Sequence, residues 1–207
     1  MPLPAGPRPP AAPLAPSQSP SQPASPLPWA QRRAGLLDGV GGILTDIDDT
    51  LTREGEIEPE ALAALHALAA AGLPVIAITG RPAGWSEPRL RAWPLLAVAA
   101  ENGGVLLQPP AGDARADAPL RISYTVDDAT RAANYTRLQA CAADILARLP
   151  QARLALDSPG RLTDIAIDHS EHHHLAAADI ARVVALMQAH GLVATVSSIH
   201  INGWIGT

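Results

Sequence analysis

The sequence of 207 residues contains no phenylalanine, and aromatic residues make up only 3% of it. Lysine is also absent, so all 15 residues in the Lys and Arg total are arginines. The formal net charge is −5. This charge argues against general nucleic-acid binding, which usually requires a basic face. Alanine and leucine are abundant, which predicts an aliphatic core in a chain long enough for one or two domains.

Cysteine and long apolar runs are scarce as well. Cys141 is the single cysteine, which excludes an intrachain disulfide. It lies in a stretch with helical periodicity, where we expect a small core residue rather than a nucleophile. No run of about 18 apolar residues occurs, so no transmembrane helix and no membrane partner are expected. The start of the chain lacks a basic region followed by an apolar stretch, which argues against a secretory signal and favours a cytoplasmic protein.

Residues 1–36 are rich in Pro, Ala, Ser and Gln. Proline fixes φ and removes backbone donors, so we expect a disordered tail here. A binding role is the alternative, because proline-rich segments dock in aromatic grooves. Ordered structure is expected from about Leu37.

The densest group of side-chain oxygens follows the apolar pair Ile43–Leu44, in the heptapeptide Asp46–Thr52 (DIDDTLT). Residues two apart in an extended strand point the same way, so Asp46 and Asp48 are expected on one face. Two carboxylates this close repel each other unless a cation compensates, and Mg²⁺ prefers oxygen ligands. For the carboxylates alone, a solvated Asp-rich turn is the alternative.

A second polar turn follows one helix later. Glu58 and Pro59 open a helical pattern that ends at Gly72, and the apolar run Val75–Ile78 predicts a strand parallel to the first. The turn Thr79-Gly80-Arg81 comes directly after it. A hydroxyl, a glycine and an arginine at a strand end can cradle a phosphate, although the same residues also make an ordinary turn. Both polar turns are expected at the same sheet edge, where open α/β sheets bind ligands.

This order of motifs resembles the first two motifs of the haloacid dehalogenase (HAD) superfamily of phosphatases. The resemblance implies that Asp46 is the nucleophile and Asp48 the general acid/base, with Mg²⁺ as cofactor bound at Asp46 and Asp48. It implies a small phosphorylated substrate as partner, held by Thr50, Thr79, Gly80 and Arg81. For Arg81, a structural salt bridge is the alternative. The chemistry suits the residue types, because a carboxylate can attack phosphorus and a neighbouring carboxyl can move the proton.

A hairpin is predicted next, with strands at 95–100 and 105–107 joined by the turn at 101–104. The turn resembles the Glu-Asn-Gly turn of HAD members that carry an α/β cap. Asn102 is expected either to touch substrate or to supply the positive φ of the turn.

The periodicity resets after the loop at 109–119. Strand 121–125, helix 127–149, strands 153–157 and 163–168, helix 175–190 and strand 193–198 give a ferredoxin-like β-α-β-β-α-β order. The expected fold class is therefore α/β: a partial Rossmann-like HAD core with an inserted α/β (ferredoxin-like) cap, preceded by the tail. The expected bounds are the tail at 1–36, half of the core at 37–108, the cap at 109–199 and the start of a return to the core at 200–207.

The expected cap offers five polar residues for substrate recognition: Arg161, Asp164, Asp168, His200 and Asn202. Polar and apolar residues alternate over 161–168, which is also typical of a strand with one buried face and one solvent-exposed face. His200 and Asn202 alternate with isoleucines in a stretch similar to the cap-to-core return of sugar-phosphate phosphatases.

The third and fourth HAD motifs, a lysine and a pair of acids, have no counterpart here. The resemblance therefore implies a truncated chain with impaired activity. The favoured function is Mg²⁺-dependent hydrolysis of a sugar phosphate through an aspartyl-phosphate. A phosphosugar mutase of the same superfamily and a non-catalytic binding module are the alternatives.

Overall fold

The computed structural model describes residue 35, residues 38–110 and residues 118–206. The expected tail thus lies outside the described residues except for Gly35, and most of the loop predicted at 109–119 lies outside them too. The chain divides into two compact units, residues 1–39 and residues 40–207. Every helix and strand below belongs to the second unit.

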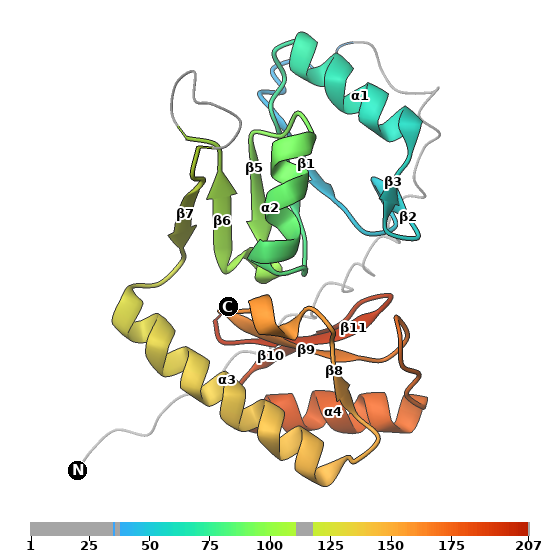
Figure 1. The fold of residues 1–207 in the computed structure, drawn as a ribbon, viewed down its shortest axis with the longest axis vertical. Coiled ribbons are helices and arrows are strands. Elements are labelled where there is room, and N and C mark those ends of the chain that lie inside the picture. The colour runs from blue at the N-terminus through green and yellow to red at the C-terminus, as the bar shows by residue number, and fades with distance from the viewer. Residues whose placement is uncertain (1–34, 36–37, 111–117, 207) are drawn as a thin grey trace, which may run out of the picture. The chain divides into compact units, whose positions relative to one another are not determined.

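The first sheet of the described residues has the strand order β1-β4-β5-β6-β7 (Figure 1). Its strands are β1 (Ile43–Asp46), β4 (Val75–Ile78), β5 (Ala97–Ala100), β6 (Val105–Gln108) and β7 (Arg121–Tyr124). The first three are parallel, whereas β6 and β7 pair antiparallel. A small hairpin of β2 (Thr52–Arg53) and β3 (Glu56–Ile57), which the sequence pattern did not predict, precedes helix α1 (Pro59–Ala70). Helix α2 (Ala83–Ala92) follows β4.

Local sequence explains the bounds of α1. Glu58 has an extended backbone and Pro59 occupies the first helical turn, where its missing N–H is not needed. The helix ends at Ala70 with Ala71 as its C-cap, and Gly72 adopts a φ of 72°. Glycine adopts this left-handed conformation without a Cβ penalty, so it ends the helix and turns the chain toward β4.

The core of the first sheet is aliphatic, as the absence of phenylalanine predicts. Ile47, Leu65, Val75, Val98 and Leu107 are among its buried residues. β1 is less buried than the apolar run suggests, because Leu44 is 68% exposed. In the described residues β1 has β4 as its one neighbouring strand, and no described helix covers Leu44.

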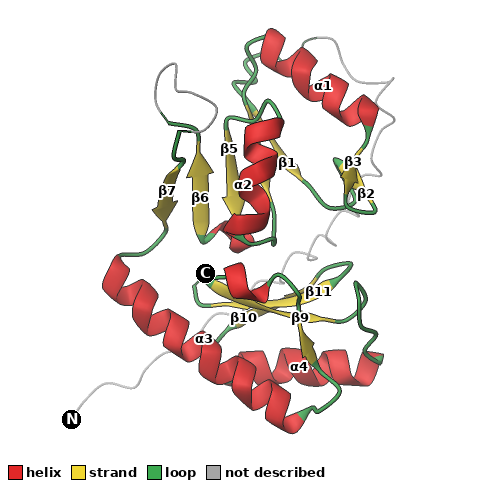
Figure 2. Cartoon of the chain, in the orientation of Figure 1, coloured by secondary structure: helices red, strands yellow, loops and turns green. Residues whose placement is uncertain are grey.

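The second sheet of the described residues is antiparallel, with the order β10-β11-β9-β8 (Figure 2). Its strands are β8 (Arg153–Leu154), β9 (Asp164–Asp168), β10 (Val193–Val196) and β11 (His200–Trp204). Helices α3 (Asp128–Arg148) and α4 (Ala177–Ala189) pack on one face of it. Their inward residues, such as Ile145 and Met187, form a second buried cluster with Ile167 and Ile201.

Two strands differ from the predicted order. β7 pairs with β6 over its whole length, so the strand predicted at 121–125 extends the first sheet and does not belong to the second. Residues His200–Trp204, predicted to begin a return to the core, instead form β11 between β9 and β10. The part of the chain from α3 onward therefore has the order α-β-β-α-β-β and not the predicted ferredoxin-like order. In both cases the strand pairs with the backbone N–H and C=O groups of a strand that would otherwise be a sheet edge, and local sequence does not reveal which strand that is.

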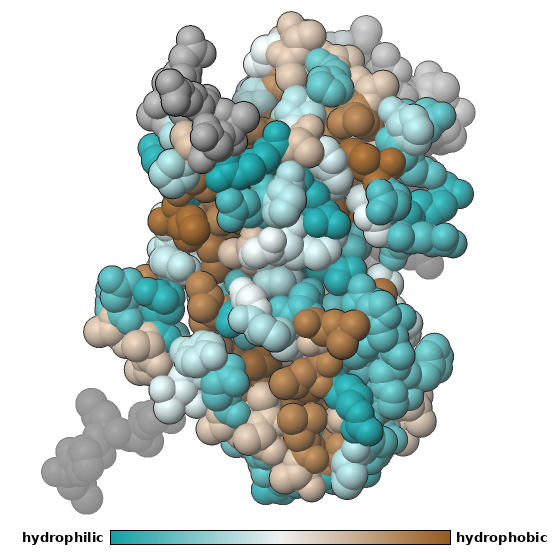
Figure 3. All heavy atoms as spheres, in the orientation of Figure 1, coloured by the Kyte–Doolittle hydropathy of each residue, from teal (hydrophilic) through white to brown (hydrophobic). Residues whose placement is uncertain are grey.

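The expected α/β class with a parallel-strand sheet is confirmed. Hydrophobic residues reach the face shown in Figure 3 in limited areas, and most of the described surface there is hydrophilic or neutral. None of the described helices combines the length and apolarity needed to cross a bilayer.

Candidate active site

The loop after β1 folds around a buried isoleucine. The carbonyl of Ile47 accepts hydrogen bonds from the backbone N–H groups of Thr50, Leu51 and Thr52, at 3.2, 2.9 and 3.1 Å. The Thr52 hydroxyl donates to the same oxygen at 3.1 Å. Ile47 has no exposed surface, so it anchors the loop while its acidic neighbours face outward. Asp46 ends β1 and Asp48 lies in the loop.

Burial and neighbouring negative charge both oppose ionisation of Asp46. Partial burial is the largest effect on Asp46 and raises its pKa above the ordinary value. The charges of Asp48 and Asp49 raise the pKa of Asp46 further, while a backbone hydrogen bond at Ile47 partly offsets them. A cation near these carboxylates would relieve this repulsion.

The turn after β4 lies against the loop. Thr79 is buried, and its hydroxyl oxygen accepts a hydrogen bond from the Arg81 backbone N–H at 3.0 Å. Gly80 has little free space, because a Cβ built there would lie 3.1 Å from Asn202 Nδ2 and 3.3 Å from Asn102 Oδ1. The glycine thus permits a close approach of two asparagines from distant parts of the chain.

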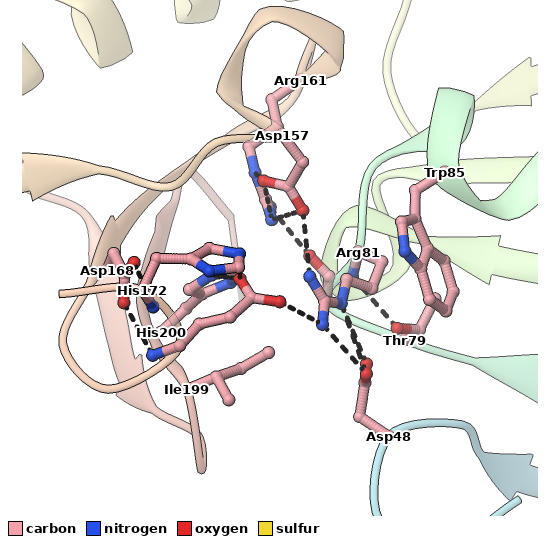
Figure 4. Close-up of polar contacts among 12 residues, drawn as sticks. Asp48, Thr79, Arg81, Trp85, Asp157, Arg161, Asp168, His172, Ile199 and His200 are labelled. Atoms are coloured by element: carbon pink, nitrogen blue, oxygen red, sulfur yellow. Dashed lines mark hydrogen bonds and ion pairs between the residues drawn. The ribbon is translucent and has the colours of Figure 1, made fainter. Parts of the chain in front are cut away.

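Arg81 contacts three carboxylates (Figure 4). Its Nε lies 3.3 Å from both oxygens of Asp48, and its Nη2 lies 2.8 Å from Glu171 Oε1. Its Nη1 lies 3.5 Å from Asp157 Oδ2. Burial tends to lower the pKa of Arg81, but the hydrogen bonds to Glu171 and Asp48 outweigh it and raise that pKa. The guanidinium therefore links the Asp48 loop to the second sheet.

A cavity of about 470 Å³ opens between the carboxylate loop and the second sheet. Seven of the residues predicted for the site line it: Asp46, Asp48, Thr50, Gly80, Arg81, His200 and Asn202. The turn between β10 and β11 forms the opposite wall. Its volume is in the range of small-molecule sites.

Three of the cap residues predicted to bind substrate are instead bonded within the protein and are not among the residues lining the cavity. Arg161 Nη1 donates to the Gly80 carbonyl at 2.8 Å and to both oxygens of Asp164 at 2.9 Å. Asp164 is 1% exposed, and burial raises its pKa to about 7 although Arg161 opposes this shift. Asp168 accepts hydrogen bonds from the backbone N–H groups of residues 170–172 and so shapes the loop that carries Glu171.

The other two cap residues, His200 and Asn202, lie on β11 and line the cavity. His200 Nε2 lies 2.8 Å from Glu171 Oε2. Burial is the main cause that lowers the pKa of His200, which favours a neutral imidazole whose Nε2–H donates to the carboxylate. Asn202 Oδ1 is buried without a hydrogen-bond partner among the described residues.

Comparisons with known proteins find similarity in part of the sequence and in the fold. A family model described as haloacid dehalogenase-like hydrolase matches residues 43–135, which include both polar turns. This part of the chain is therefore similar to the haloacid dehalogenase-like hydrolases. A search of curated proteins finds no match.

Solved structures of low identity share the fold. The Thermoplasma acidophilum protein 0175 is 17% identical with a TM-score of 0.58, covering 80% of this chain and 64% of that one. IMP-bound Plasmodium falciparum IMP-nucleotidase is 11% identical with a TM-score of 0.53, covering 83% and 54%. The C-terminal domain of C. albicans trehalose-6-phosphate phosphatase is 10% identical with a TM-score of 0.55, covering 79% and 56%. This HAD-like chain thus spans between about half and two thirds of these structures.

Sequence reasoning missed two acidic residues of this HAD-like site. Asp157 and Glu101 both join the sheets: Asp157 contacts Arg81 and Arg161, and Glu101 lies in the turn after β5. Glu101 is 1% exposed, and its Oε2 accepts bonds from the backbone N–H groups of Leu162 and Thr163 at 2.9 and 2.7 Å. A Glu just before Asn-Gly in an apolar hairpin is a weak signal, because its partners lie about 60 residues later.

Asn102 performs a structural role at the same turn. Its φ is 54°, and its Nδ2 donates to Asp164 Oδ2 at 2.8 Å. The side chain thus both accommodates the left-handed backbone and connects the turn to β9. Asn102 also lines the cavity, so contact with a ligand stays open.

Proposed function

We propose that this chain carries the catalytic site of a Mg²⁺-dependent phosphatase that hydrolyses a small phosphate monoester through an aspartyl-phosphate. One observation carries the proposal: Asp46 and Asp48 line one cavity together with Thr50 and Arg81. Two of the structural neighbours are named as a trehalose-6-phosphate phosphatase and an IMP-nucleotidase, and hydrolysis of a phosphate monoester suits both names.

The two aspartates have separate roles in the proposed reaction. An oxygen of Asp46 attacks phosphorus, and the bond from phosphorus to the alcohol oxygen breaks as Asp48 gives that oxygen a proton. Water then attacks the same phosphorus while Asp48 takes its proton, and the bond between phosphorus and the Asp46 oxygen breaks, which restores the Asp46 carboxylate. Inorganic phosphate leaves, and both carboxyl groups return to their starting states.

The turn residues hold the phosphoryl group in this proposal. Thr50 and Gly80 line the cavity, and Thr79 supports the turn through its bond with the Arg81 N–H. Arg81 contributes positive charge and holds the Asp48 carboxylate in place. Oriented donors and a guanidinium near the phosphoryl oxygens stabilise the charge that develops during transfer.

The oxygen-rich loop suits a hard cation. The described residues hold no group of three or more His, Cys, Asp or Glu side chains placed as a metal site. Mg²⁺ often needs only one or two carboxylates, with waters and substrate oxygens completing its shell. Asp46 and the backbone carbonyl of Asp48 would hold the ion, and its charge would offset the burial and the neighbouring negative charges that raise the Asp46 pKa. When bound, it would supply positive charge to the phosphoryl oxygens.

We propose a sugar phosphate rather than a nucleotide as substrate. Among the described residues, no Trp or Tyr lines the cavity, and the chain contains no Phe. Aromatic faces are a common platform for bases, whereas hydroxyl, amide and carboxylate groups suit a polyol. Two of the lining residues are aliphatic, Val196 and Ile199.

We expect slow turnover by the 207-residue chain. The sequence has no lysine, and Arg81, which lines the cavity, is already engaged with three carboxylates. Its guanidinium must shift from at least one of them to meet a phosphoryl group.

The test is phosphate release from a panel of sugar phosphates and nucleoside monophosphates, with Mg²⁺ and with EDTA. Asp46→Asn removes the nucleophile, and Asp144→Asn changes an aspartate outside the cavity as a matched control. Mg²⁺-dependent release that Asp46→Asn abolishes and Asp144→Asn preserves supports the proposal. Equal rates for the unaltered chain and Asp46→Asn on every substrate contradict it.

A further inference from the structure

Asn202 occupies a rigid position on the wall of the cavity. It lies in the middle of β11, opposite Thr195 of β10 and Ala166 of β9. Strands on both sides fix its backbone. Only 4% of the residue is exposed, yet it lines the cavity with Asp46 and Asp48. Its direction is therefore set by the sheet and not by a flexible loop.

The amide oxygen of Asn202 has no hydrogen-bond partner within the described part of the chain. This atom, Oδ1, is buried. Buried polar groups in folded proteins are nearly always hydrogen-bonded, so an unpaired one calls for an explanation. Polar neighbours differ in this respect: Asn102 donates to Asp164, and His200 bonds Glu171.

Three other residues predicted to recognise substrate form hydrogen bonds within the protein instead. Arg161 and Asp164 bond each other, and Asp168 bonds three backbone N–H groups. Asn202 thus combines a place on the cavity wall with an amide oxygen that has no partner among the described residues. A Cβ built at Gly80 would lie 3.1 Å from Asn202 Nδ2, so the nitrogen side of the amide lies against the turn after β4, and Oδ1 is the unpaired atom.

We propose that Asn202 determines substrate specificity by hydrogen-bonding a hydroxyl of the alcohol part of the phosphate ester. The unpaired atom is Oδ1, which can only accept a hydrogen bond, so a hydroxyl can donate to it whereas an ionised phosphoryl oxygen cannot. The proposal rests on the proposed phosphatase function for the position of the phosphate end. It assigns Asn202 to the alcohol part and not to the phosphoryl group.

The test compares two esters with the same carbon chain, glycerol 3-phosphate and propyl phosphate, which differ in two hydroxyls. Binding of each to the whole chain with Mg²⁺ is followed by NMR titration, which requires no turnover. Asn202→Leu preserves the branched shape and removes the amide. Asn134→Leu is the matched control, because Asn134 is a residue of α3 outside this cavity.

We expect the unaltered chain and Asn134→Leu to bind glycerol 3-phosphate more tightly, and Asn202→Leu to lose about tenfold of that preference. Propyl phosphate should bind Asn202→Leu and the unaltered chain alike. Asn202→Leu should also melt no lower than the unaltered chain, because it removes an unpaired buried polar group. If it does not fold, Asn202→Ser provides the same comparison of the two esters.

Three results overturn the proposal: an unchanged preference in Asn202→Leu, an equal loss of both esters, or no binding of either ester to the unaltered chain. An equal loss would place the amide on the phosphoryl group. Phosphate release, measured in parallel, separates this proposal from the proposed function. If binding shows a preference for glycerol 3-phosphate that depends on Asn202, but no phosphate is released, the recognition role of Asn202 is supported and the proposed phosphatase function is contradicted.

Discussion

The guanidinium of Arg81 lies 2.8 Å from the carboxylate of Glu171, 90 residues later in the sequence. Arg81 follows β4 of the first sheet, and Glu171 follows β9 of the second. Because the same guanidinium also holds Asp48, the position of the proposed general acid depends on contact between the two sheets. The first two predictions concern the ion pair between Arg81 and Glu171.

Arg81→Gln should lower the free energy of unfolding by about 3 kcal/mol, because it leaves partly buried carboxylates without their cation. Urea unfolding followed by circular dichroism measures this. The double variant Arg81→Gln/Glu171→Gln should recover part of the loss, since one of the unpaired charges is gone. Strictly additive effects of the two substitutions would show that the pair contributes no coupling.

The stabilising effect of Glu171 should depend on pH. Burial tends to raise the pKa of Glu171, but Arg81 and His200 outweigh it and hold that pKa below its ordinary value. The unfolded state therefore takes up the proton first as the pH falls, so stability is lost below about pH 4.5. Glu171→Gln should cost more free energy at about pH 6 than at about pH 3.5. A cost that is the same at both values would mean that the carboxylate charge is not responsible.

Glu101→Gln should weaken the junction between the turn after β5 and the residues before β9. The Glu101 carboxylate accepts hydrogen bonds from the backbone N–H groups of Ala83, Leu162 and Thr163. Gln replaces one of the two accepting oxygens with an NH₂ group, so at least one of these hydrogen bonds is lost and two donors face each other. We expect a loss of about 2 kcal/mol, and faster hydrogen exchange at Leu162 and Thr163. Glu87→Gln, at a partly exposed position of α2, is the control that should change neither quantity.

Cys141 should report opening of the second sheet's core. It has no exposed surface, and burial raises the pKa of its thiol to about 11. At pH 8 the thiol is therefore both shielded and protonated, and a thiol reagent should react slowly in buffer and quickly in guanidinium chloride. Equally fast labelling in both conditions would place Cys141 at the surface.

The parts predictable from sequence are those with local signals. The apolar run ending in carboxylates predicted β1 and its loop, and Pro59 and Gly72 predicted the limits of α1. The equivalent signal at Val75–Ile78 predicted β4 and its turn. The wall of the cavity also contains residues named from sequence, His200 and Asn202.

The other features depend on partners far away in the sequence. Nothing local to residues 121–124 distinguishes pairing with β6 from pairing in the second sheet. In the sequence, Asp168 and Arg161 stand in a polar, alternating stretch typical of recognition residues. In the structure, Asp168 accepts hydrogen bonds from the loop after β9, and Arg161 forms a buried ion pair with Asp164. Charge and hydrogen-bonding capacity can be read from sequence, whereas the partner that satisfies them is set by the fold.

The central claim is that the Asp46 carboxylate becomes phosphorylated. The chain is incubated with acetyl phosphate and Mg²⁺, then reduced with borohydride, which converts an aspartyl-phosphate into homoserine, and its peptides are read by mass spectrometry. The account predicts homoserine at position 46 in the unaltered chain and in Asp144→Asn, and none in Asp46→Asn. Homoserine at another aspartate, or none at position 46 under any of these conditions, would contradict it.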